Sequence, residues 1–192
     1  MAKLYFYYSS MNAGKSTTLL QSSFNYRERG METMLWTAAV DDRYGAGRIV
    51  SRIGLEAQAH IFDAATDLFA AIAAQQAHSP LSCILIDEAQ FLNEEQVWQV
   101  ATVCDRLNIP VLCYGIRTDF QGKLFEGSAA LLGLADTLNE IKTICECGRK
   151  ATMNLRVDAQ GAPIRRGEQT EIGGNDRYVA LCRRHFAERM QR

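Results

Sequence analysis

A short aromatic strand that runs directly into a glycine- and lysine-containing turn constrains this chain more than any other feature. The segment Leu4–Tyr8 is followed by Ser9-Ser10-Met11-Asn12-Ala13-Gly14-Lys15-Ser16-Thr17, and helical periodicity begins at Ser16. This is the Walker A pattern, with Ser9 in place of its first glycine. Backbone amides of residues 11 to 16 can surround a phosphate, and the dipole of the following helix adds to the attraction. The order of strand, loop and helix therefore predicts a nucleotide-binding P-loop fold.

Four charged or polar side chains in two segments could carry the chemistry of such a fold. Lys15 offers a point charge to the β- and γ-phosphates, and the Ser16 hydroxyl can bind Mg²⁺. The apolar run 82–86 ends in Asp87 and Glu88, the Walker B form, and Asp87 there can hold the Mg²⁺ hydration shell. Glu88 could take a proton from an incoming nucleophile, or it could only favour the dipole of a following helix. We predict the catalytic role for Glu88.

Short apolar or aromatic segments alternate with helical patterns up to about residue 141. Such alternation predicts a mostly parallel sheet with helices on both faces, in which ligands bind beyond the carboxyl ends of the strands. The predicted strands are Leu4–Tyr8, Thr33–Val40, Cys83–Asp87 and Pro110–Gly115, and the predicted helices are Ser16–Arg29, Asp67–Gln76 and Glu94–Leu107.

The last 50 or so residues differ in character. From Thr143 onward glycines become frequent and helical periodicity is lost, while the alternating stretch Ala151–Val157 suggests a hairpin. We therefore predict a nucleotide-binding domain over residues 1–141 and a small second domain over residues 142–192. This second piece is too small and too polar to depend on an apolar core, so a covalent or metal staple is expected.

Three cysteines and one histidine in that piece supply a candidate staple. Cys145 and Cys147 form Cys-x-Cys, and after 34 intervening residues Cys182 and His185 form Cys-x-x-His. Four such ligands in two close pairs suit tetrahedral Zn²⁺, and with no position open to water the metal is expected to be structural. Three unrelated thiols and a surface histidine are the alternative. The cysteines at 83, 104 and 113 lie in apolar runs and are interpreted as small buried residues.

Overall charge and hydrophobicity exclude some partners. The formal net charge is −1 and the pI about 6.3, so no strong basic field attracts nucleic acid. No apolar run approaches the roughly 20 residues that span a bilayer. We therefore expect neither a nucleic acid nor a membrane partner.

Five sequence motifs resemble, in their order along the chain, those of the thymidine kinase family shared by many bacteria and the animal cytosol. The motifs are most similar to those of enzymes from Gram-negative enteric-type bacteria. The resemblance covers nearly the whole chain, and its markers are Met11–Ser16, Asp41–Tyr44, Asp87–Phe91, Gly115–Phe120 and Ile172–Tyr178.

The resemblance implies a RecA-like P-loop NTPase fold with a small zinc-containing C-terminal domain. It also implies transfer of the ATP γ-phosphate to the 5′-hydroxyl of thymidine or deoxyuridine. Glu88 would be the general base, Lys15 the transition-state clamp, and Ser16 and Asp87 the Mg²⁺ ligands. By motif position, the nucleotide contacts would be Ser9, Ser10, Met11, Asn12, Ala13, Gly14, Lys15, Ser16, Asp87 and Gln90.

The resemblance further implies that the stretch from about Arg149 to Tyr178 forms a lasso-like loop that closes over the nucleoside. Phe120 would stack on the base and Tyr178 would lie near the sugar, although both could equally be packing residues. Met11 could line a pocket for the base methyl group or simply pack, and Asp41 with Arg43 could instead form a salt-bridged loop. The implied substrate contacts are Met11, Asp41, Arg43, Phe91, Phe120, Ile172, Gly173 and Tyr178.

A homotetramer, a cytoplasmic location and feedback inhibition by thymidine triphosphate are also implied by the resemblance alone. Two other classes of protein remain open at this point. One is a motor-type or recombinase-like ATPase with a zinc ribbon for DNA, and the other is a nucleotide-sensing module without turnover. The sequence does not fix how strictly thymidine is preferred over deoxyuridine or deoxycytidine.

Overall fold

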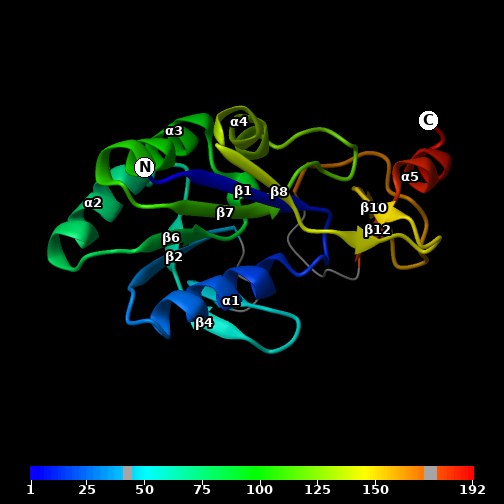
Figure 1. Ribbon diagram of the computed structural model, residues 1–192. Coiled ribbons are helices and arrows are strands. Elements are labelled where there is room, and N and C mark those ends of the chain that lie inside the picture. The colour runs from blue at the N-terminus through cyan, green and yellow to red at the C-terminus, as the bar shows by residue number, and fades with distance from the viewer. Residues whose placement is uncertain (41–44, 171–176) are drawn as a thin grey trace.

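A single parallel sheet lies at the centre of the computed structural model, which describes residues 1–40, 45–170 and 177–192 (Figure 1). Its six strands follow the order β5-β2-β6-β7-β1-β8, and every described pairing among them is parallel. The predicted parallel sheet is thus confirmed. The strands are β1 (Leu4–Ser9), β2 (Thr33–Ala38), β5 (His60–Phe62), β6 (Cys83–Ile86), β7 (Val111–Ile116) and β8 (Thr137–Glu140).

Helices cover both faces of this sheet, as predicted (Figure 1). One face carries α1 (Lys15–Arg27) and the hairpin of β3 (Arg48–Val50) and β4 (Glu56–Gln58). The opposite face carries α2 (Leu68–His78), α3 (Glu94–Thr102) and α4 (Glu126–Leu134). The two layers leave the carboxyl ends of the strands uncovered by helix, and this is where the chemistry-bearing turns emerge.

Successive apolar side chains of each central strand pack on opposite faces of the sheet, which explains why both faces are covered by helices. In β6, Ile84 and Ile86 pack toward α2, α3 and α4, whereas Cys83 and Leu85 pack toward α1. All four are fully buried, and burial of one such aliphatic side chain contributes about 1.5–3 kcal/mol. A strand that is apolar on both sides has to lie inside a three-layer arrangement.

The starts of the helices differ in a way that bears on function. Asp67 Oδ1 accepts a hydrogen bond from the Ala70 amide at 2.9 Å and so caps α2. Asn93 and Gln96 form a reciprocal capping box at α3. By contrast, α1 begins after Gly14, which has no side chain to occupy the first amides. Uncapped amides at a helix start are groups that can receive an anion.

Several elements were not expected from the sequence: α4, the edge strands β5 and β8, and the β3–β4 hairpin. The predicted helix Glu94–Leu107 is α3 followed by one π-helical stretch, η2 (Val103–Leu107), which ends at Asn108 in the left-handed conformation (φ 54°). The alternating stretch Ala151–Val157 does contain a strand, β11 (Met153–Arg156). Its partner, however, is the distant β12 (Tyr178–Leu181), so the main pairing is not the local hairpin that was predicted.

The C-terminal part has a small apolar core of its own, formed chiefly by Leu155, Leu181, Phe186 and Met190. Its elements are β9 (Thr143–Ile144), β10 (Lys150–Ala151), β11, β12 and α5 (Arg183–Met190). Two-stranded sheets of this length are marginal in water without further support. Among the described helices of the whole chain, none is long and apolar enough to cross a membrane.

Both tryptophans belong to the sheet and its helices. Trp36 lies on β2, is 4% exposed, and has its ring centroid 5.0 Å from that of His60 on β5. Trp98 projects from α3 and is 51% exposed. The edge strand β5 is therefore held to the sheet by a ring contact as well as by backbone pairing.

Candidate active site

Three turns at the carboxyl ends of neighbouring strands form the candidate site. The phosphate loop follows β1, the Asp87–Glu88 turn follows β6, and the segment 117–120 follows β7. Because β6, β7 and β1 are adjacent and parallel, their following turns meet at one edge of the sheet. Figure 1 shows the C-terminal elements β10, β12 and α5 beyond this same edge.

The phosphate loop holds its lysine in a folded-back position. Asn12 and Gly14 adopt left-handed conformations, with φ of 63° and 87°. The Lys15 side chain is buried, and its Nζ donates to Ser9 Oγ at 3.1 Å and to the Ser10 carbonyl at 3.2 Å. Ser9, which replaces the first glycine of the motif, thus supplies a hydroxyl that contacts the lysine.

One amide of the loop points away from the phosphate position. The Met11 amide donates to Asn154 Oδ1 at 2.7 Å, so this group contacts the C-terminal part of the chain. The expectation that all the amides of residues 11 to 16 surround a phosphate therefore does not hold for Met11.

Ser16 and Asp87 lie together as candidate Mg²⁺ ligands. Ser16 Oγ donates to Asp87 Oδ2 at 2.8 Å. Burial, together with the neighbouring Glu88 carboxylate, raises the pKa of Asp87 to about 7, while the bond from Ser16 opposes this change. Oxygen atoms of these two types are the ligands that Mg²⁺ accepts, and a divalent cation would offset the cost of a buried carboxylate. The residues present therefore fit this ion.

Glu88 is held in an unusual backbone conformation. Its φ is 52°, its amide donates to Asp87 Oδ1 at 3.0 Å, and its carboxylate accepts a hydrogen bond from Gln90 Nε2. Gln90 Oε1 in turn accepts from the Ile116 amide at 3.1 Å. The amide of Gln90, expected at the nucleotide, thus lies between Glu88 and strand β7.

Phe120 and Tyr178 both contact one arginine. The Arg156 guanidinium carbon lies 3.8 Å from the Phe120 ring centroid, and Arg156 Nε donates to the Tyr178 hydroxyl at 2.9 Å. The same guanidinium donates to the carbonyls of Glu168 at 3.0 Å and Gln169 at 3.2 Å. One buried side chain thereby joins the aromatic pair to the loop that was expected to cover the nucleoside.

The other residues expected to contact the substrate lie in the larger core, in the phosphate loop or outside the described part of the chain. Phe91 meets Phe125 edge to face, with centroids 5.8 Å apart, and packs against the larger core. Met11 lies in the phosphate loop and is partly exposed. Asp41, Arg43, Ile172 and Gly173 lie outside the described residues.

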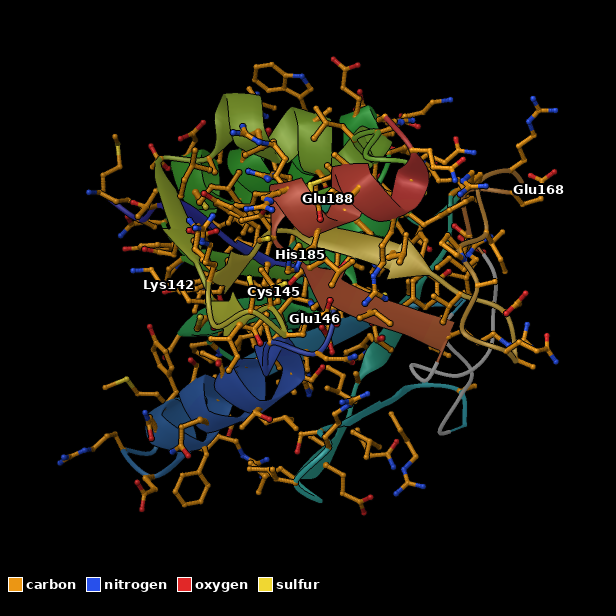
Figure 2. All side chains as sticks on the ribbon, turned by 90° about the vertical axis from the view of Figure 1, so that its right-hand side faces the viewer. Lys142, Cys145, Glu146, Glu168, His185 and Glu188 are labelled. Carbon is orange, nitrogen blue, oxygen red and sulfur yellow. The ribbon has the colours of Figure 1, made fainter. Side chains whose placement is uncertain are left out.

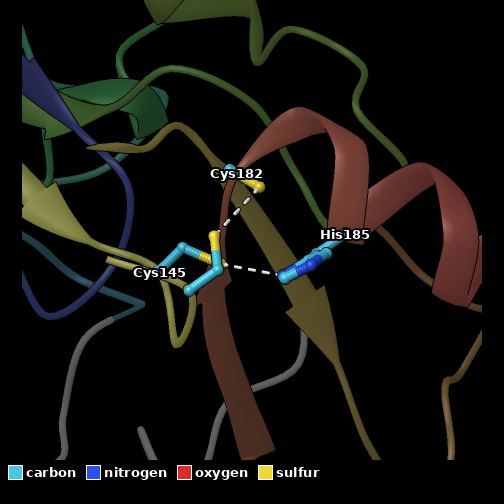
Figure 3. A group of neighbouring side chains, drawn as sticks. Cys145, Cys182 and His185 are labelled. Atoms are coloured by element: carbon cyan, nitrogen blue, oxygen red, sulfur yellow. Dashed lines mark hydrogen bonds between the residues drawn. The ribbon is translucent and has the colours of Figure 1, made fainter. Parts of the chain in front are cut away.

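The cysteine–histidine set does assemble in space. The ligand atoms of Cys145, Cys147, Cys182 and His185 all lie within 4.8 Å of one another. Two contacts close the group, Cys145 Sγ to His185 Nδ1 at 3.3 Å and Cys147 Sγ to Cys182 Sγ at 3.9 Å. Figure 3 shows Cys145, Cys182 and His185 turned toward one another. Sulfurs of a tetrahedral zinc site, each about 2.3 Å from the metal, lie about 3.8 Å apart. The four side chains therefore fit Zn²⁺.

Local structure explains how the two halves of this set form. Residues 145–149 make a tight turn between β9 and β10, in which the Gly148 amide donates to the Cys145 carbonyl at 2.8 Å. Cys182 precedes α5, whose first turn carries His185. Burial opposes ionisation of Cys145, but bonds from the Cys147 and Cys182 amides and from His185 lower its pKa to about 6. Figure 2 shows Cys145, Glu146 and His185 gathered at the side of the molecule that faces the viewer.

Comparison with known proteins agrees with this geometry. The family model described as thymidine kinase matches residues 2–186. The chain belongs to the thymidine kinase family. A thymidine kinase of Novosphingobium aromaticivorans is 73% identical over 190 residues and covers 99% of each chain. That of Zymomonas mobilis is 67% identical, covering 99% of this chain and 98% of its own. That of Vibrio cholerae is 61% identical over the full length of both chains.

The predicted membership of the thymidine kinase family, with relatives in Gram-negative bacteria, is thus confirmed. A solved structure, replication initiator DnaA bound to AMPPCP and single-stranded DNA, aligns with a TM-score of 0.41 at 15% identity. It covers 74% of this chain and 41% of that one, a likeness too weak to bear on function.

Two residues that contribute to the candidate site, Asn154 and Arg156, were not predicted from the sequence. Both lie on β11 and both are buried. Asn154 accepts from Met11 and also donates through Nδ2 to the Thr118 carbonyl at 3.0 Å. Polar residues in a segment that should pack a small core are a signal that could have marked them.

Proposed function

We propose that this protein transfers the γ-phosphate of ATP to the 5′-hydroxyl of thymidine, and also of deoxyuridine. The observation that carries the proposal is the convergence of Lys15, Ser16 with Asp87, and Glu88 at one sheet edge of a chain from this family. Relatives named thymidine kinase match along essentially the whole chain, which supports the same substrate here.

The proposed roles follow from charge and position. Lys15 and the open amides at the start of α1 bind the nucleotide phosphates, within a nucleotide site that extends over Ser9–Ser16 and Asp87. Gln90, expected at the nucleotide, is assigned to Glu88 instead. Ser16 and Asp87 hold Mg²⁺, which supplies charge neutralisation on the β- and γ-phosphates when it is bound. Glu88 takes the proton of the 5′-hydroxyl as the hydroxyl attacks in line.

The proposed nucleoside site lies between the phosphate loop and the C-terminal part. Phe120, backed by Arg156, stacks on the base, Tyr178 lies near the sugar, and backbone groups of the lasso at about 149–178 read the pyrimidine edge. Closure of such a lid excludes water and so limits wasteful ATP hydrolysis. Further proposed contacts are Met11, Asp41, Arg43, Phe91, Ile172 and Gly173.

In this proposal, zinc at the four Cys and His ligands is structural. It ties the residues just before the lasso, Cys145 and Cys147, to those just after it, Cys182 and His185. The division into domains at 1–141 and 142–192 is proposed on the same basis, since the second part has its own small core. A homotetramer, a cytoplasmic location and feedback inhibition by thymidine triphosphate complete the proposal, from family membership.

Nucleoside-dependent release of ADP tests the proposal. We would supply Mg-ATP with thymidine, deoxyuridine, deoxycytidine or deoxyguanosine in turn. Turnover with thymidine and deoxyuridine alone is the expected result. ADP release that is indifferent to every nucleoside would contradict the proposed substrate and would favour an ATPase, to be tested next with DNA. No ADP release under any condition would favour a nucleotide-sensing module.

A further inference from the structure

The turn that carries Glu88 is enclosed on two sides by glycines. It continues into the 3-10 helix η1 (Ala89–Phe91), which lies between β7 and α4. A Cβ atom on Gly115 of β7 would lie 2.9 Å from Gln90 Oε1 and 3.0 Å from the Gln90 amide nitrogen. A Cβ atom on Gly127 of α4 would lie 2.5 Å from the Leu92 carbonyl oxygen and 2.7 Å from that of Ala89. No alanine fits either place without a shift of the turn.

Close approach, and not backbone conformation, accounts for these two glycines. Gly115 and Gly127 are absent from the positive-φ residues of the described chain, so other residues could adopt their dihedral angles. Gly127 is the second residue of α4, and a residue with a side chain could adopt the same helical conformation. The close approach of η1 is therefore the feature that favours glycine there.

Gln90 occupies the space that Gly115 leaves. Its side chain is 2% exposed, donates to the Glu88 carboxylate, and accepts from the Ile116 amide at 3.1 Å. The Ile116 carbonyl accepts from Ser128 Oγ of α4 at 2.6 Å, so β7, η1 and α4 are joined at this residue. An amide side chain suits the place because it combines one donor and one acceptor.

Glu88 itself needs such support. A left-handed conformation costs a residue other than glycine about 1–2 kcal/mol, and it persists only where the surroundings enforce it. The bond from the Glu88 amide to Asp87 Oδ1 fixes the backbone, and the bond from Gln90 fixes the carboxylate. The direction of the carboxylate is therefore set by neighbours and not by the turn alone.

We propose that Gln90 is a positioning residue for the Glu88 carboxylate, and that Gly115 and Gly127 permit β7 and α4 to close on the turn that carries both. The inference rests on the proposed function, in which Glu88 is the general base. A base has to lie within hydrogen-bond reach of the hydroxyl whose proton it takes, so a turned carboxylate lowers kcat more than it weakens substrate binding.

The first test replaces Gln90→Met, which keeps the length of the side chain and removes both hydrogen bonds. Loss of a hydrogen bond to a charged group predicts a fall in kcat of about 10- to 100-fold. The KM for ATP is expected to stay within about threefold, because the phosphate loop is untouched. Added to Glu88→Gln, the same change should have little further effect, since residues that act as a unit are not additive.

The second test compares two glycines of one helix. Gly127→Ala forces a shift of η1 and should lower kcat, whereas Gly133→Ala, where a Cβ meets nothing within 4 Å, should leave kcat unchanged. Gly115→Ala is the companion variant from the β7 side and should act as Gly127→Ala does. Melting temperatures of all three variants identify any that fails to fold.

Distinct outcomes overturn the inference or the function beneath it. A kcat for Gln90→Met within about twofold of the unchanged protein, or effects of Gln90→Met and Glu88→Gln that multiply, would overturn the positioning role. Near-normal turnover by Glu88→Gln would overturn it too, while the kinase activity stands. Absence of nucleoside-dependent turnover in the unchanged protein would overturn the proposed function itself and this inference with it.

Discussion

The parallel sheet and the C-terminal part place their functional groups by different means. The sheet buries apolar side chains on both faces, and its chemistry lies on contiguous stretches, Ser9–Ser16 and Asp87–Glu88, that leave the strands on either side of β7. The C-terminal part has one small core, and its groups come from distant segments, as Cys145 with His185 and Arg156 with Tyr178. The first region is stabilised by hydrophobic area, and we expect the second to depend on its ligands.

Removal of one zinc ligand should separate the two regions most clearly. Cys182→Ser is expected to lower bound zinc from about one equivalent to none and to unfold residues beyond about 143, because a structural metal contributes several kcal/mol to a small fold. The nucleoside KM should rise sharply, while binding of an ATP analogue to the sheet persists. Metal analysis and hydrogen exchange measure the change.

A cysteine in the sheet region provides the matched control. Cys104→Ser, at a buried position of η2 in the larger core, is expected to lower overall stability without loss of zinc. If Cys182→Ser keeps its zinc, its melting temperature and its nucleoside KM, the metal has no structural role and the contrast between the regions is wrong.

Breaking the hydrogen bonds that join the two regions is expected to have the next largest effect. Asn154→Leu leaves the part-buried Met11 amide without its partner and removes the buried bond to Thr118, at a cost of about 1–3 kcal/mol in the free energy of unfolding. Calorimetry should show the two regions unfolding at more widely separated temperatures. Asn139→Leu on the edge strand β8 is the control for the chemical change. Equal stability of Asn154→Leu and the unchanged protein would show that the contact couples nothing.

Arg156 tests whether the aromatic pair serves the nucleoside. Arg156→Lys keeps the charge but loses the flat stacking on Phe120 and several hydrogen bonds, so the nucleoside KM should rise about tenfold. The KM for ATP should not change. Steady-state kinetics with each substrate varied in turn measure this split. Arg184→Lys, an exposed residue of α5, is the control, and a parallel rise in both KM values would point to general disruption.

The smallest effect is expected from the surface ion pair across the boundary. Lys150 Nζ of β10 lies 2.6 Å from Glu140 Oε2 of β8, and the lysine side chain is 49% exposed. Exposed pairs contribute less than about 1 kcal/mol, so Lys150→Met should shift the melting temperature by only a few degrees. A larger loss would mean that charge, and not buried contact, joins the two regions.

The sequence predicted the elements whose pattern is local and missed those defined by distant contacts. Strands such as β1 and β6 are apolar on both faces and border a clear loop motif. By contrast, β8 reads Thr-Leu-Asn-Glu because an edge strand needs little apolar surface. Helix α4 contains Gly127 and Gly133, which argue against a helix until the approach of η1 to Gly127 is known.

The residues of the candidate site show the same difference between local sequence motifs and contacts with distant residues. The spacing of the Cys and His residues was enough to predict a metal cluster, and the phosphate loop and the Asp87–Glu88 turn were predicted from their motifs. Asn154 and Arg156 were not, because their partners lie 12 or more residues away in the sequence. Nor could the amide of Gln90 be assigned to Glu88, since that contact depends on the distance between β7 and η1.

The placement of the two tryptophans makes the sheet the only region visible to indole emission. Trp36 lies buried on β2 and Trp98 half-exposed on α3, and residues 142–192 contain no tryptophan. Fluorescence on denaturation therefore reports melting of the nucleotide-binding layers, and unfolding of the C-terminal part alone would go unseen. An indole introduced beyond residue 142 would give that part its own optical signal.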